Sequence, residues 1–164
     1  MFQTKAIETE DKPSFYRDLA QQLEGLLSGE TDAIANAANT AALLFTTLPD
    51  LNWAGFYFLR QPEELVLGPF QGKPACVRIA VGRGVCGAAV KERRTQRIED
   101  VHAFTDHIAC DAASRSELVV PLLRGKEVIG VLDLDAPIPA RFDADDQRGI
   151  EAIASLYIKA SAAL

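Results

Sequence analysis

The sequence predicts an α+β domain in which helices pack against a mostly antiparallel, six-stranded sheet. Its 164 residues fit one domain, and a composition with 48% hydrophobic and 24% charged residues is ordinary for a globular protein. Strand-like segments follow one another as hairpins, and helical patterns stand at both ends of the chain. Hairpins favour antiparallel pairing, and helices outside the strand runs favour the α+β class.

The chain is expected to begin with an arm and two helices. Residues 1–12 are polar and predict a loose N-terminal arm, so residues 13–164 are assigned to the folded domain. Apolar residues at helical spacing follow Pro13 and stop at Gly29, as in a helix with proline at its start. Asp32 caps a second, alanine-rich helix.

The middle of the chain carries the strongest strand signal. The segment 51–60 (LNWAGFYFLR) is aromatic and apolar on both faces, which predicts a central strand. A hairpin strand is expected at 65–67, a loop with two glycines and two prolines at 68–74, and a further strand at 77–81. Residues 84–92 predict a short helix.

The C-terminal third predicts a second hairpin and a final helix. A short edge strand at 96–98 is followed by a polar, irregular segment at 101–114 with at most one helical turn. Strands at 117–123 and 128–134 are expected to pair through the turn between them. Asp143 then caps the last helix.

The charge balance excludes several classes of partner. A net charge of -6 and a pI of about 4.9 argue against nucleic acid and anionic membranes, because both require a basic surface. The sequence has no apolar run of the length that spans a bilayer, so no membrane association is expected. The first residues lack the apolar core of a signal peptide, which predicts a cytoplasmic protein.

The sequence holds three cysteines, Cys76, Cys86 and Cys110, which cannot all pair within one monomer. In a reducing compartment, any disulfide is expected to be transient or catalytic. Cys76 and Cys110 fall in polar loops, where a thiol is accessible, whereas Cys86 lies on the short helix among apolar neighbours. Burial there should raise the pKa of Cys86 unless the helix N-terminus offsets it. The spacing matches no zinc motif, so no metal site is expected.

The segment 82–87 (GRGVCG) matches the glycine pattern of a dinucleotide-binding turn. That interpretation requires a parallel βαβ unit, whereas two helices and a hairpin precede the segment here. The simpler interpretation is that the glycines permit a tight turn from strand to helix.

Three carboxylates are expected at one end of the second hairpin. Asp133 and Asp135 are two residues apart and share a face of their strand, and the hairpin turn brings Glu117 to the same end. Clustered carboxylates repel one another, so the pKa of one should rise, and the cluster should attract an ammonium group. The alternative is an ordinary, solvated acidic strand end.

Trp53 and Tyr57 are four residues apart in the predicted central strand, so they share a face. Core packing is the common role of such aromatics. The sharper alternative is an aromatic wall for a small apolar ligand group.

Taken together, five segments resemble the free methionine-(R)-sulfoxide reductases, which are stand-alone GAF-domain enzymes: WAGFYF, GPFQGKPAC, GRGVCG, IACDAASRSELVVPL and GVLDLDAP. The likeness runs from about Asn52 to the final helix. It implies a single GAF domain, with the N- and C-terminal helices on one face of the sheet. The short helix and loops would cover a ligand pocket on the other face.

The resemblance also implies a thiol mechanism. Cys110 matches the family's nucleophile, Cys76 its resolving thiol, and Cys86 a secondary thiol. Attack on the sulfoxide would leave a sulfenic acid, then a disulfide that thioredoxin reopens with electrons from NADPH through thioredoxin reductase. No bound cofactor is implied.

The resemblance implies that acidic and aromatic residues bind the substrate. Asp135 and Glu117 are the candidate proton donors, and the residues alone leave open which one acts. The substrate would contact these expected site residues: Trp53, Tyr57, Glu117, Asp133 and Asp135.

Two other interpretations stay open, a non-catalytic GAF sensor of a small molecule and a GAF scaffold. A sensor normally regulates an attached output domain, and 164 residues leave no room for one. GAF domains often pair through terminal helices, so a homodimer is an expectation.

Overall fold

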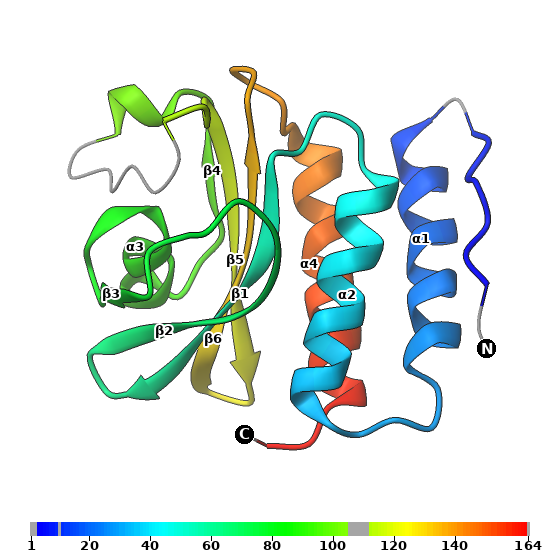
Figure 1. The fold of residues 1–164 in the computed structure, drawn as a ribbon, viewed down its shortest axis with the longest axis horizontal. Helices are drawn as coiled ribbons and strands as arrows, with labels where there is room; N and C mark the ends of the chain where they lie inside the picture. Colours follow the sequence, from blue (N-terminus) through cyan, green and yellow to red (C-terminus); the bar gives the residue numbers. More distant parts are fainter. Residues whose placement is uncertain (1–2, 10, 105–111, 164) are drawn as a thin grey trace.

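The computed structural model describes residues 3–9, 11–104 and 112–163. A six-stranded sheet separates the three long helices from a face covered by the short helix α3 and its flanking segments (Figure 1). The spatial order of the strands is β3-β2-β1-β6-β5-β4, and each pairing between described strands is antiparallel. The α+β prediction with an antiparallel sheet is therefore confirmed. The strands are β1 Trp53–Gln61, β2 Glu64–Gly72, β3 Arg78–Ala80, β4 Gln96–Ile98, β5 Ser116–Arg124 and β6 Glu127–Ala136.

Side-chain caps set where the long helices begin. In α2 (Ala33–Thr47), the Asp32 carboxylate accepts hydrogen bonds from the first free backbone N–H groups. In α4 (Ala144–Ala160), Asp143 forms a complete capping box. Helices α2 and α4 lie on the sheet, whereas α1 (Lys12–Leu27) packs outside α4 (Figure 1). The terminal helices thus occupy one side, as expected, but in two layers.

Strand β2 is longer than the sequence predicted. The expected loop at 68–74 is wrong as far as Gly72, because β2 stays paired with β1 up to that residue. Leu67 and Phe70 both pair with β1, and the two residues between them face Phe56 alone. This is a β-bulge, one of the positions in a sheet where the missing N–H of a proline such as Pro69 is tolerated.

The sheet buries a separate apolar cluster on each face. Along β1, Phe56 and Phe58 point into the larger cluster beneath the long helices. Trp53 and Tyr57 alternate with them and join the smaller cluster beneath α3. The expectation that these two aromatics share a face is confirmed, and the smaller cluster forms the floor of the site.

Glycines allow the chain to turn from β3 into α3 (Gly84–Glu92). Gly82 and Gly84 have positive φ values of 86° and 60°. A side chain at Gly87 would place its Cβ 2.5 Å from the carbonyl oxygen of Ala80. The interpretation of GRGVCG as a tight turn is confirmed, since the antiparallel pairing of the described strands does not form a dinucleotide-binding unit.

No helix in the described ranges is both long and apolar enough to cross a membrane.

Candidate active site

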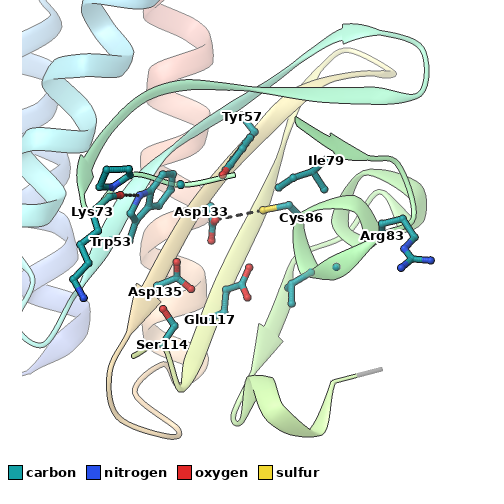
Figure 2. Close-up of a pocket in the computed structure, with 14 residues that line it drawn as sticks. Trp53, Tyr57, Lys73, Ile79, Arg83, Cys86, Ser114, Glu117, Asp133 and Asp135 are labelled. Carbon is teal, nitrogen blue, oxygen red and sulfur yellow. Dashed lines mark hydrogen bonds between the residues drawn. The ribbon is translucent and has the colours of Figure 1, made fainter. Parts of the chain in front are cut away.

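A pocket opens on the α3 side of the sheet, between the strand ends and the N-terminus of α3 (Figure 2). Strand β1 supplies its aromatic wall, and β5 and β6 supply its acidic side. The segment between β2 and β3 and the first turn of α3 close it from the other side. Of the eight residues predicted for the site, six line the pocket: Trp53, Tyr57, Cys86, Glu117, Asp133 and Asp135. A seventh, Cys76, lies beside it, where its carbonyl accepts a hydrogen bond from Tyr57.

The three carboxylates do meet on adjacent strands. Glu117 pairs directly with Asp135, and Asp133 lies one pleat further along β6 on the same face. Glu117 and Asp133 are only 6% and 5% exposed, so neither belongs to a solvated strand end. Figure 2 shows all three side chains turned toward the pocket.

Burial raises the pKa values of Glu117 and Asp133 to different extents. Burial, followed by the charges of Asp133 and Asp135, holds the pKa of Glu117 well above its usual range. Burial raises the pKa of Asp133 to about 7, with the Cys86 thiol and the Glu117 carboxyl working in the opposite direction. Within the described part of the chain, no cationic side chain contributes to either shift. Glu117 therefore keeps its proton to a higher pH than an exposed glutamate, and Asp133 titrates near neutral pH.

Cys86 lies in the first turn of α3 and faces these acids. Its Sγ donates a hydrogen bond to Oδ2 of Asp133 over 3.4 Å (Figure 2). Burial and the neighbouring charges of Asp133 and Glu117 raise its pKa well above the usual value. The predicted burial of Cys86 is confirmed. Its position at the N-terminus of α3 does not cancel the rise in its pKa.

The aromatic wall also fixes the segment between β2 and β3. The rings of Trp53 and Tyr57 stack with centroids 5.8 Å apart. The indole N–H of Trp53 donates to the carbonyl of Lys73 over 3.2 Å, and the Tyr57 hydroxyl donates to the carbonyl of Cys76 over 3.0 Å. These two residues therefore serve both core packing and the pocket wall.

Cys76 and Cys86 are in different states. Cys76 is half-buried beside the pocket and is disulfide-bonded, whereas Cys86 is a free thiol. The predicted nucleophile, Cys110, lies outside the described residues.

Some lining residues were not predicted. Ser114 is buried, and its hydroxyl accepts a hydrogen bond from the Asn52 side-chain amide over 3.0 Å. Lys73 and Arg83 bring positive charge to the rim. All three fall within segments noted in the sequence, but no spacing rule singled them out individually.

By distance alone, the pocket could also hold a metal ion. Ligand atoms of Cys86, Glu117 and Asp133 all lie within 4.8 Å of one another. Cys86 and Glu117 would both have to lose a proton first, because the pKa of each is raised. The arrangement therefore suits proton donation better than cation binding.

Known proteins resemble this chain in both sequence and fold. The GAF domain family matches residues 34–160. The free methionine-R-sulfoxide reductase of Escherichia coli (strain K12) is 56% identical over 140 residues, covering 85% of this chain and 84% of the relative. A substrate complex of the Neisseria meningitidis free methionine-R-sulfoxide reductase is 43% identical, with a TM-score of 0.93 over 98% of this chain and 95% of that one. The reduced Staphylococcus aureus enzyme gives 49% identity and a TM-score of 0.86, covering 96% and 99%.

Proposed function

Because the chain belongs to the free methionine-R-sulfoxide reductases of the GAF-domain family, we propose that it reduces free L-methionine-(R)-sulfoxide to methionine. One observation carries the chemistry. Glu117, buried and with a pKa held well above its usual range, faces a pocket that also holds ionisable Asp133. A sulfoxide needs both a proton for its oxygen and, in a free amino acid, a counter-charge for its ammonium group.

The pocket provides separate places for the two ends of such a substrate. The ammonium group would bind Asp133 and Asp135, and Oδ1 of buried Asp133 has no hydrogen-bond partner in the described ranges. The methyl and thioether end would rest against the stacked rings of Trp53 and Tyr57. A peptide-bound residue has no free ammonium group to offer these acids, which favours the free amino acid.

Glu117 is the better candidate for the proton donor. Sulfoxide oxygen is a poor leaving group until it is protonated, and a donor must hold its proton at working pH. The raised pKa of Glu117 meets that condition. Asp135 then binds the substrate ammonium group together with Asp133.

The thiol steps follow the family mechanism. The Cys110 thiolate attacks the sulfoxide sulfur, Glu117 protonates the oxygen, and the products are methionine and a Cys110 sulfenic acid. The Cys76 thiol condenses with the sulfenic acid, which forms a disulfide and releases water. A thioredoxin dithiol reduces that disulfide and is itself reduced by NADPH through thioredoxin reductase. The disulfide-bonded state of Cys76 supports its assignment as the resolving thiol.

The test is a coupled assay with thioredoxin, thioredoxin reductase and NADPH. We expect NADPH consumption with the free R-sulfoxide, and little with the S-epimer or with N-acetylated substrate. Saturable binding of the R-sulfoxide without methionine release would contradict the proposal and favour a non-catalytic sensor.

Two variants assign the thiols. Cys110→Ser should abolish even one turnover, because no nucleophile remains. Cys76→Ser should still release one methionine per enzyme but fail to recycle with thioredoxin. Loss of that single turnover in Cys76→Ser would reverse the assignment.

A further inference from the structure

The reaction above uses two thiols and leaves the third, Cys86, without a role. Cys86 is only 4% exposed, yet it lines the pocket rather than the apolar core alone. Its hydrogen-bonded partner is an acid that the substrate would contact. This position suggests that the Cys86 thiol acts on Asp133 within the same site.

We propose that Cys86 is a positioning residue: its S–H group donates a hydrogen bond to Asp133, holds that side chain as the anion that binds the substrate ammonium, and takes no part in electron transfer. The inference rests on the proposed function, because it assigns Asp133 to substrate binding.

The surroundings of Asp133 explain why a donor is needed there. The titratable groups that face it are Glu117 from β5, Asp135 from β6, Tyr57 from β1 and Cys86 from α3. None of these four can bring a positive charge, so burial favours the neutral acid. The S–H bond from α3 opposes this effect and lowers the pKa of Asp133.

An ionised Asp133 would also support the proton donor. Its negative charge is among the main causes that raise the pKa of Glu117. If Asp133 took up a proton, the substrate would lose a counter-charge and Glu117 would hold its own proton less tightly. Cys86 therefore acts through Asp133 on both binding and acid catalysis.

The same environment makes Cys86 a poor redox thiol. Thiol–disulfide exchange requires the thiolate, and burial among carboxylates disfavours that form. A protonated thiol, in contrast, is the state that can donate to Asp133. Both features favour the hydrogen-bonding role over a second resolving role.

The experiment compares Cys86→Ser, Cys86→Ala and Val90→Ala. Serine keeps a donor but removes the redox-active sulfur, and alanine removes both. Val90 is buried on the same helix but does not line the pocket, so its variant controls for a cavity in α3. Thermal unfolding of all three confirms that the compared proteins are folded.

We expect the acid limb of the kcat/KM profile of Cys86→Ala to move upward by about one pH unit, with a higher KM at pH 7. Cys86→Ser should keep most of the wild-type profile and should recycle with thioredoxin. Val90→Ala should keep the wild-type pH profile. Equal loss of activity in the serine and alanine variants, or failure of Cys86→Ser to recycle, would overturn the proposal.

A second readout does not depend on turnover. Carbon NMR titration of the Asp133 carboxyl should give a higher pKa in Cys86→Ala than in the wild-type protein or Cys86→Ser. An unchanged Asp133 pKa would overturn the positioning role even in an active enzyme. If the Asp133 pKa differs between Cys86→Ala and the wild-type protein as expected, but the wild-type protein reduces no sulfoxide, the proposed function is contradicted and the positioning role is not.

Discussion

The molecule buries carboxylates in two places, and their partners make them different. Asp146, at the start of α4, is only 1% exposed, but its oxygens contact Lys12 at 2.6 Å, Arg141 at 3.3 Å and the Tyr16 hydroxyl at 2.8 Å. Glu117 and Asp133 are nearly as buried, and within the described residues they face a thiol and other acids.

The comparison shows that burial alone does not make an acid functional. The cations around Asp146 compensate its charge, so it ties α1 to α4 and supports the fold. Among the described residues, Glu117 and Asp133 lack such compensation, and burial raises the pKa of each.

The largest effect is expected in the pocket. Glu117→Gln keeps the shape of the side chain but removes its transferable proton, so methionine formation should slow by about 10²–10⁴-fold. The variant should be at least as stable as the wild-type protein at neutral pH, because a buried acid has been replaced by a neutral amide. Single-turnover kinetics and urea unfolding measure the two quantities.

Glu127→Gln is the matched control, since Glu127 is exposed at the far end of β6. It should leave both rate and stability unchanged. A normal rate in Glu117→Gln would transfer the proton-donor role to Asp135.

The next effect is expected at the structural acid. Asp146→Asn should destabilise the fold by about 3 kcal/mol, because Arg141 would be left buried beside a neutral side chain. Reduction rates measured on folded protein should stay near wild type. Asp145→Asn, which removes an exposed partner of Arg148, should cost less than about 1 kcal/mol. Equal losses in the two variants would mean that the buried contacts of Asp146 contribute nothing special.

The smallest effect within any one pH unit is a difference in the pH dependence of stability. The folded-state pKa of Asp133 lies near 7, above its ordinary value of 3.8, so the folded protein binds more protons between these limits. Stability should therefore fall as pH rises through this window, by at most about 1.4 kcal/mol per pH unit. Asp133→Asn should flatten that slope in urea unfolding. An unchanged slope would contradict the assignment.

The opposite sign is expected next to Asp146. A hydrogen bond from Lys12 lowers the pKa of Asp143 to about 2, so its contribution is present above its ordinary pKa of 3.8 and is lost as pH falls toward 2. Lys12→Met should reduce this acid-side loss in urea unfolding, since only the backbone N–H groups of Asp145 and Asp146 would still lower the pKa of Asp143, and it should leave the slope near neutral pH intact.

Local rules were enough to predict much of the fold. Capping by Asp32 and Asp143 and the glycines of the β3–α3 turn act over a few residues, so the sequence displays them directly. The extent of β2 could not be predicted, because the bulge that accommodates Pro69 depends on its pairing with β1. Local propensity alone favours a loop there.

The acidic cluster could be predicted because hairpin register places Glu117 opposite Asp135. The order of the pKa values could not, because it depends on burial and on which groups face each other across the pocket. The same holds for Cys86: its neighbours in the sequence are apolar, and only the packing of α3 on the sheet brings it to Asp133.

The most direct test of this contrast is a carbon NMR titration of the Glu117 side-chain carboxyl in the substrate-free protein. We expect the Glu117 carboxyl to titrate well above the ordinary pKa of 4.5, because it is buried beside Asp133 and Asp135. A Glu117 carboxyl that titrates near 4.5 would contradict this expectation.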